Sequence, residues 1–300
     1  MSDTNLQKKP SILIAGPNGS VGKHVVNAIL QNRDSFSQLA IITKEDGPKY
    51  DHLRNKGFEI VLNEEGVKLE GFDIFFIALS FEAVQLEMEL IELAIKSGIK
   101  TIYPSEFGLD IDSIELTPLN EPRKNIRQYL RQKHSEGVVD YVFVVANAFL
   151  DWGLDFGFWG YDLTKHEATI YNGGNYDISW TFIEDLGQSI VRSFLDDSTR
   201  NTVLNLSTIS ASQNDILREF EVQTGSTWKR VNVSSDSLSG SEELLEKGDF
   251  FGALQLVLHA LSFNRTINDK FNDLPVKRYP NLKLHTLQEV ITSVLSSTKK

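Results

Sequence analysis

The stretch Ser11-Ile-Leu-Ile-Ala-Gly-Pro-Asn-Gly-Ser-Val-Gly22 decides the fold of this chain. The apolar run over residues 11–15 predicts a short strand, and apolar side chains at helical spacing over 21–30 predict a helix. The glycines between them predict a tight turn. Unpaired backbone amides and the positive end of the helix dipole meet at such a turn, so it favours binding of an anion.

The three glycines of this turn have separate expected roles. Gly16 allows the tight bend, Gly19 lets the backbone approach a diphosphate, and Gly22 lets the helix pack closely on the strand. Their spacing is three and three, whereas the usual dinucleotide fingerprint has two and three. Because the turn follows the first strand of an alternating chain, we predict a dinucleotide site. A turn kept only for packing is the alternative.

Strands and helices alternate through the first half of the chain. Continuous apolar strands that alternate with helices are typical of a parallel sheet covered on both faces, so we predict a doubly wound α/β fold. Further strands are expected at 39–43, 58–62, 72–79, 100–103 and 141–146, and helices at 52–56, 82–96 and 120–134. Beyond residue 150 we expect a turn at 173–175, helices at 184–195, 213–224 and 242–261, and a strand at 202–206.

Beyond residue 150, strands and helices alternate less regularly than before it. This change predicts two domains. Residues 10–152, with returning segments at about 180–208, would form the dinucleotide-binding domain. Residues 153–179 and 209–300 would form a smaller C-terminal α/β substrate domain. No repeat or low-complexity linker separates them, so we expect the two to pack directly on each other.

Composition excludes several classes of function. The 300 residues carry a net charge of −11, which gives no general attraction to nucleic acid or to an anionic membrane. The absence of cysteine removes disulfides, thiolate metal sites and a cysteine nucleophile. The six histidines have no metal-ligand spacing, so no metal is expected. With neither a secretory signal nor a spanning segment expected, we predict a cytoplasmic monomer or homodimer that binds a small-molecule substrate.

The end of the second strand indicates which dinucleotide binds. A carboxylate there would bond the ribose of NAD, whereas a cation would accept the additional phosphate of NADP. The strand ends at Thr43, with Lys44 and then Glu45 after it. Lys44 at the deciding position favours NADP, and we predict NADP(H). A register shifted by one residue would place Glu45 there and favour NAD.

Later motifs add a family resemblance. Thr101-Ile-Tyr-Pro-Ser-Glu-Phe-Gly108 resembles the signature of the isoflavone-reductase-like, NmrA-like branch of atypical short-chain dehydrogenases. The three-and-three glycine spacing is similar to that branch, and Ala148-Phe-Leu-Asp-Trp152 is similar to its fungal members. The resemblance implies a Rossmann-type domain that binds NADP and a smaller substrate domain. Many members reduce small aromatic substrates, and others are regulators that bind the dinucleotide without known catalysis.

The resemblance also implies which residues contact the cofactor. The glycine turn and the residue after the second strand would hold the nucleotide, while later loops would lie beside the nicotinamide. The implied cofactor-binding residues are Gly16, Asn18, Gly19, Ser20, Val21, Gly22, Lys44, Ser80, Gln85, Pro104, Ser105, Asn147 and Phe149.

The helix expected at 120–134 departs from the family pattern. Reductases of the family carry a lysine there, four residues before an arginine. Here Arg123 stands four residues before Arg127, and Lys124 is one position off. Helical geometry places Arg123 about 67° from the centre of the apolar face and Lys124 about 167° from it. We therefore expect Lys124 to face solvent and Arg123 to border the buried side. Arg127 aligns with the family's substrate-side arginine, and we interpret it as a solvated surface charge.

An arginine changes the chemistry available at this position. With a pKa above about 12, arginine does not exchange a proton near neutral pH as a tuned lysine can. Arg123 could still stabilise a developing oxyanion or bind a carboxylate. A phosphate-binding or structural role for Arg123 stays open. Arg123 and Arg127 are the catalytic candidates.

Aromatic side chains cluster just after the sixth predicted strand. Six of them lie between Phe149 and Tyr161. They could form an apolar pocket for a flat substrate, or instead an inter-domain core or a subunit interface. Tyr161 and Lys165 have the spacing of the ordinary short-chain dehydrogenase pair but follow the sixth strand instead of preceding it, so we interpret that match as chance.

Two functions fit these patterns. The first is an NADP(H)-dependent oxidoreductase of the isoflavone-reductase-like type that reduces a small aromatic or apolar carbonyl or enone by hydride transfer. The second is an NmrA-like redox-sensing regulator that binds NAD(P) without turnover and acts through a protein partner. The arginine in place of the family lysine favours the second, and the rest of the pattern favours the first.

Overall fold

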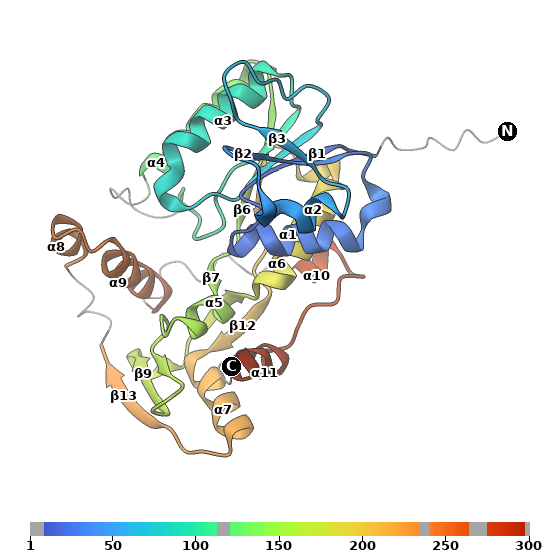
Figure 1. Ribbon diagram of the computed structural model, residues 1–300. Coiled ribbons are helices and arrows are strands. Elements are labelled where there is room, and N and C mark those ends of the chain that lie inside the picture. The colour runs from blue at the N-terminus through green and yellow to red at the C-terminus, as the bar shows by residue number, and fades with distance from the viewer. Residues whose placement is uncertain (1–8, 113–120, 235–239, 264–274, 298–300) are drawn as a thin grey trace. The chain divides into compact units, whose positions relative to one another are not determined.

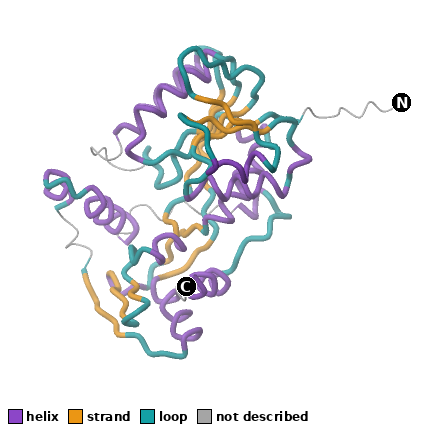
Figure 2. The backbone as a smooth tube through the Cα atoms, in the orientation of Figure 1, coloured by secondary structure: helices purple, strands orange, loops and turns teal. Residues whose placement is uncertain are grey.

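The computed structural model describes residues 9–112, 121–234, 240–263 and 275–297, and its backbone is shown in Figures 1 and 2. The described chain divides into two compact units. Residues 9–106, 121–144 and 187–204 form the first unit; residues 107–112, 145–186 and those described from 205 onward form the second.

The first unit is built on a seven-stranded sheet. Its order is β11-β6-β5-β4-β1-β2-β3, and the pairs from β3 across to β6 are all parallel. The order reverses at β1, where β2 lies on one side and β4 on the other. Its strands are β1 (Ile12–Ala15), β2 (Leu39–Thr43), β3 (Glu59–Leu62), β4 (Ile74–Ile77), β5 (Thr101–Tyr103), β6 (Asp140–Val145) and β11 (Thr202–Asn205).

Helices cover both faces of this sheet. Figure 1 shows α3 and α4 together on one face, with α1 on the other. On the α3–α4 face, Leu13 and Phe75 of the sheet pack with Ile91 of α3 and Ile126 of α4 in one buried cluster. The helices are α1 (Ser20–Gln31), α2 (Asp51–Arg54), α3 (Val84–Lys96), α4 (Glu121–Ser135) and, from residue 187 onward, α6 (Ile183–Phe194). The doubly wound α/β fold predicted from the alternation is confirmed.

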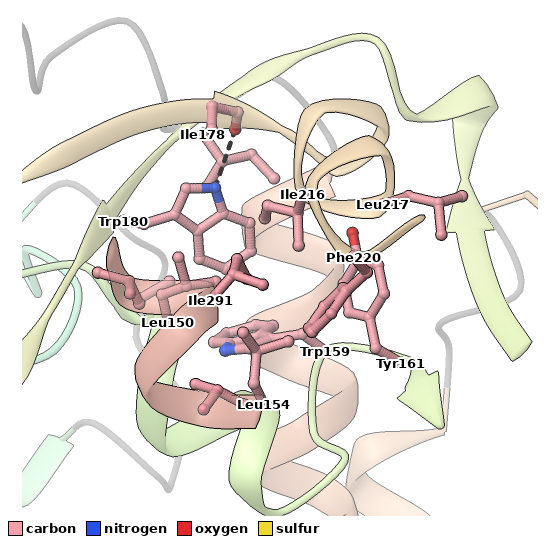
Figure 3. Close-up of a cluster of buried hydrophobic side chains, with 14 of the residues drawn as sticks. Leu150, Leu154, Trp159, Tyr161, Ile178, Trp180, Ile216, Leu217, Phe220 and Ile291 are labelled. Carbon is pink, nitrogen blue, oxygen red and sulfur yellow. Dashed lines mark hydrogen bonds between the residues drawn. The ribbon is translucent and has the colours of Figure 1, made fainter. Parts of the chain in front are cut away.

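The second unit contains two small sheets and a separate aromatic core. One sheet has the order β12-β10-β7 and the other β13-β9-β8. Figure 3 shows the core, in which Trp159, Trp180, Tyr161 and Phe220 lie among aliphatic side chains. Its elements are β7 (Ala148–Phe149), α5 (Leu150–Asp155), β8 (Tyr161–Asp162), β9 (Glu167–Tyr171), β10 (Asp177–Thr181), β12 (Ile209–Ser212), α7 (Gln213–Thr224), β13 (Lys229–Val233), α8 (Ser241–Glu246), α9 (Phe250–Phe263), α10 (Pro275–Arg278) and α11 (Leu287–Ser297).

The unit boundaries differ from the predicted domains. The first domain was expected to reach residue 152, but 145–186 belong to the second unit. The reason is that β7 pairs with β10, a strand the sequence pattern did not indicate. The returning segment is 187–204 instead of about 180–208.

The region expected as one or two helices over 242–261 contains α8 and α9. Gly248, with φ of +78°, lies between them, whereas Gly252 lies inside α9. Within the described residues, the helices are all too short or too polar to cross a membrane.

Candidate functional site

The turn between β1 and α1 requires glycine at two positions. Gly16 has φ of +76°, and a Cβ atom there would lie 2.2 Å from the carbonyl oxygen of Ala78. A Cβ atom on Gly22 would lie 2.0 Å from the carbonyl oxygen of Gly16. Both distances are far inside van der Waals contact. The close approach of β1, β4 and α1 therefore depends on these two glycines.

The amino end of α1 is open to an anion. Its N-cap is Gly19, which makes no side-chain capping bond, and no acidic residue lies in the first turn. Helical geometry leaves the first-turn amides without intrahelical acceptors, and they carry the positive end of the dipole. A Cβ on Gly19 would lie 3.5 Å from the carbonyl oxygens of Ala78 and Gly16, which is ordinary van der Waals contact, so the protein's own packing does not require glycine here. The local geometry fits a diphosphate group.

A cleft of about 480 Å³ lies at this turn. It follows the carboxyl ends of β1 and β2, where the strand order reverses, and open α/β sheets bind their ligands at such a position. Its polar wall contains Asn18, Thr43, Lys44 and Asn63. Its apolar wall contains Leu79, Leu86 and Leu90. The cleft is thus suited to a ligand with a flat apolar part and an anionic part.

Several charged side chains follow β2, and among the described residues one lysine there has no carboxylate partner. Glu45 pairs with Lys49 at 3.0 Å, and Asp46 pairs with Arg54 at 2.6 Å. Lys44 is exposed, lines the cleft and forms no ion pair with any residue that the structure describes. The first residue after β2 is therefore a net positive charge directed at the ligand side of the sheet.

Arg123 is buried in an ion pair. It is 6% exposed on α4 and pairs with Glu87 of α3, whose exposure is 0%. Its Nη2 also donates to the carbonyl oxygen of Ser80 at 3.2 Å, and its guanidinium lies 5.7 Å from the ring centre of Phe81. Burial lowers the pKa of Arg123 to about 10, so it stays protonated at neutral pH. The sequence placed Arg123 at the border of the buried side, and the structure buries it.

The expectation for Arg127 is wrong. It was predicted as a solvated surface charge, but its exposure is 0%. It pairs with Glu106, which is 6% exposed, and its guanidinium lies 4.9 Å from the ring centre of Phe143. The buried carboxylate that follows β5 offsets the cost of burying this cation. Lys124, expected to face solvent, is half-buried.

Comparisons with known proteins give the family. The model of the NmrA-like family matches residues 8–256. The chain belongs to the NmrA-like family. Oxidoreductase aprR of Aspergillus flavus is 26% identical over 95% of this chain and 98% of that relative.

Two solved structures show the same fold. The crystal structure of isoflavone reductase has a TM-score of 0.78 at 20% identity, over 95% of this chain and 99% of that one. The leucoanthocyanidin reductase–NADPH complex of Vitis vinifera has a TM-score of 0.76 at 22% identity, over 95% and 99%. At these identities the likeness establishes the doubly wound NmrA-like fold.

The structure brings part of the predicted cofactor set together. Gly16, Asn18, Gly19 and Lys44 line the cleft. The other predicted cofactor residues of the first unit do not line the cleft. Three of them lie in the first turn of α1: Ser20, Val21 and Gly22. The other four follow β4 or β5: Ser80, Gln85, Pro104 and Ser105.

Two further predicted cofactor residues belong to the second unit. Asn147 is buried with φ of +59°, and its side-chain amide donates to the carbonyl of Ser179 at 2.5 Å. Asparagine tolerates this left-handed conformation better than most residues. Phe149 is half-buried, and its carbonyl accepts the indole N–H of Trp159 at 2.7 Å. Their predicted place beside the nicotinamide stays a prediction.

Sequence reasoning missed Glu87. One of its carboxylate oxygens faces Arg123, and the other accepts the backbone amide of Ser105 at 2.6 Å. A signal was present, because Glu87 shares the buried face of α3 with Ile91 and Ala94 at helical spacing. A carboxylate on an apolar stripe predicts a buried partner.

The aromatic stretch forms mainly core. Phe158, Trp159 and Tyr161 are buried, and the hydroxyl of Tyr161 donates to the carbonyl of Gln213 at 2.8 Å. Phe156 is 66% exposed. The three buried aromatic side chains therefore stabilise the second unit. The hydrogen bond of the Tyr161 hydroxyl is made within this core.

Proposed function

We propose that this protein is an NADP(H)-dependent oxidoreductase of the isoflavone-reductase-like type. Its substrate would be a small aromatic or otherwise apolar carbonyl or enone, reduced by hydride transfer. The names of the relatives, an oxidoreductase and reductases of flavonoid-type aromatics, support this class. A matched NADPH complex among the structures of the same fold supports the cofactor.

The observation that carries the proposal is the charge pattern at the cleft. The open amino end of α1 suits the diphosphate, and Lys44 suits the additional phosphate that distinguishes NADP from NAD. Because Glu45 is paired with Lys49, the carboxylate that could favour NAD is partly neutralised. The NADP preference over NAD thus follows from the pairing of the neighbouring side chains.

The chemistry divides between the cofactor and the chain. NADPH, when bound, supplies a hydride to the substrate carbon. The turn residues would hold its diphosphate, and the segments after β4 and β5 would orient the remainder. Arg123 cannot supply the accompanying proton near neutral pH, so we assign that proton to water. The catalytic roles of Arg123 and Arg127 stay predictions.

Turnover is tested with NADPH and a panel of quinones, enones and aromatic aldehydes. We expect steady oxidation of NADPH with at least one of these classes, and slower oxidation of NADH with the same substrate. Calorimetry with NADPH in the absence of substrate tests binding separately. No heat and no thermal shift with saturating NADPH or NADP⁺ would reject the proposal.

A second candidate is a dinucleotide-sensing regulator without turnover. Arg123 favours it, because an arginine in place of the family lysine does not transfer a proton near neutral pH, and its buried pair with Glu87 keeps it charged. Tight NADPH binding without oxidation across the whole panel, together with a protein partner whose binding depends on the redox state of the nucleotide, would support this candidate.

A further inference from the structure

Glu87 joins four segments of the first unit. It projects from α3 and pairs with Arg123 of α4. Its other oxygen accepts the amide of Ser105, which follows β5, at 2.6 Å. The hydroxyl of Ser105 in turn accepts the amide of Leu79, which follows β4, at 2.7 Å. The carboxylate is thus connected to both segments at the carboxyl ends of β4 and β5.

Arg123 closes this network from the other side. Its Nη2 donates to the carbonyl of Ser80, next to Leu79, at 3.2 Å. Both charged groups are almost completely buried, so solvent screens their attraction very little. Removing one partner of such a pair leaves the other charge buried and uncompensated, which is strongly unfavourable.

We propose that Glu87 is a positioning residue of the reductase: its carboxylate holds the cation at position 123 stationary and ties it to the segments that follow β4 and β5. The assignment rests on the proposed function. In an open α/β sheet, these segments lie at the edge that receives the ligand. The glycine turn and Lys44 would hold the phosphates independently of Glu87. Loss of Glu87 therefore affects the reaction step more than the capture of the nucleotide.

The proposed role of Glu87 predicts the protonation state of a lysine introduced at position 123. A buried carboxylate favours the charged form of a neighbouring amine, whereas burial without a partner favours the neutral form. In Arg123→Lys alone, Glu87 keeps the new lysine protonated, so the variant gains no proton-transfer group. In the double variant Glu87→Gln, Arg123→Lys, the lysine loses its counter-ion and titrates at lower pH.

The test compares these two variants by NMR titration of lysine labelled at Cε. We expect the introduced lysine to titrate at least about two pH units lower in the double variant than in R123K. Gln128→Lys, on the exposed side of the same helix, is the matched control and titrates as an ordinary lysine. The assignment is wrong if the introduced lysine titrates at the same pH in R123K and in the double variant.

Folding of the double variant does not limit the test. Glu87→Gln, Arg123→Gln removes both charges and shows whether the site tolerates their loss. If the double lysine variant does not fold, R123K alone decides the question. If the introduced lysine of R123K loses its proton below pH 9, the proposed role of Glu87 is wrong. If that lysine stays protonated up to pH 9, the result supports the role.

Kinetics add a readout that a purely structural role would not move in the same way. For Glu87→Gln we expect kcat to fall at least about tenfold while KM for NADPH changes less than about threefold. The positioning role is contradicted if kcat falls and KM for NADPH rises by the same factor, or if only KM for NADPH rises. If the wild-type protein oxidises no NADPH, the proposed function fails, but the lysine titration still tests the Glu87 assignment because it needs only the folded chain.

Discussion

At the scale of single residues, we propose that Lys44 carries the nucleotide preference. The acids that follow it are paired with other cations, so its charge is not cancelled locally. We predict that Lys44→Glu weakens NADPH binding about 10- to 100-fold, because a charge-assisted bond to phosphate is replaced by repulsion. NADH binding should change less than about threefold. Calorimetry measures both affinities.

Lys56→Glu is the matched control for Lys44→Glu. Lys56 is exposed and lies outside the lining of the cleft, so the same change of charge should leave both affinities near their wild-type values. Equal losses for NADPH and NADH in Lys44→Glu would contradict contact with the additional phosphate.

Gly16 is the residue on which the turn depends. We predict that Gly16→Ala lowers the free energy of unfolding by at least about 3 kcal/mol, because a left-handed conformation and a backbone clash add together. Gly57 also has positive φ, +84°, but a Cβ there meets nothing within 4 Å. Gly57→Ala should therefore cost only about 1 kcal/mol. Denaturant titration measures both, and equal costs would refute the clash.

At the scale of elements, α6 packs on α1 through a glycine. A Cβ atom on Gly187 would lie 2.7 Å from the backbone of His24. We predict that Gly187→Ala destabilises the protein by about 1–3 kcal/mol, although alanine is the better helix former. Thermal and denaturant unfolding check this value.

Gly252 supplies the comparison within a helix. The three atoms nearest a Cβ there all belong to the side chain of Asp249, whose carboxylate accepts the amide of Gly252 at 2.9 Å. Because this side chain can move at the cost of that hydrogen bond, Gly252→Ala should change the free energy of unfolding by less than about 1 kcal/mol. If Gly187→Ala behaves in the same way, α6 does not need a glycine to approach α1.

At the scale of the whole molecule, the half-buried Asp151 and the buried His259 of the second unit have opposite effects on stability as pH changes. Burial raises the pKa of Asp151 to about 6, and burial lowers the pKa of His259 to about 4. The Nε2 of His259 bonds the carbonyl of Phe158 at 2.5 Å and its Nδ1 the hydroxyl of Tyr171 at 3.1 Å. Since a carbonyl only accepts, Nε2 carries the proton of the neutral ring.

These shifts have opposite effects on stability. The contribution of Asp151 is present below its unfolded pKa and is lost as pH rises through about 6. The contribution of His259 is present above its unfolded pKa of about 6.5 and is lost as pH falls toward about 4. Each contribution amounts to about 3 kcal/mol, so between about pH 4 and 6 the two partly cancel.

Single substitutions separate the two groups. We predict that Asp151→Asn makes the free energy of unfolding rise more steeply with pH between 4 and 6.5, and that it stabilises the protein at pH 7. His259→Gln should instead make the free energy of unfolding rise less steeply, or fall, with pH between 4 and 6.5. Denaturant unfolding at a series of pH values gives both slopes. Slopes that match the wild type would show that neither group is perturbed by folding.

Much of the fold could be predicted from local patterns. The run of apolar strands and the glycine spacing are local in sequence, and they predict the parallel sheet and the turn at β1 without knowledge of any contact. The sequence offered Lys44 and Glu45 as alternatives for the position after this strand, and the structure ends β2 at Thr43, so Lys44 is the first residue after it. The small sheets of the second unit were missed, since β7 and β8 each span only two residues and show no period.

The candidate site shows where local patterns stop. Arg123 and Arg127 lie one helical turn apart, and Arg127 was wrongly expected to be a solvated surface charge. Their partners come from other elements, with Glu87 on α3 and Glu106 after β5. A carboxylate that offsets the burial of a cation is found only when those elements pack together.

The sequence by itself determined the architecture of the first unit, the glycine turn before α1 and the lysine that follows β2, because each depends on neighbouring residues and on backbone preference. The tertiary structure alone decided the state of the two arginines on α4. Whether a charge is solvated or buried in a pair depends on which side chains the fold brings within reach. The pairing of Glu87 with Arg123 was therefore visible only in the folded chain.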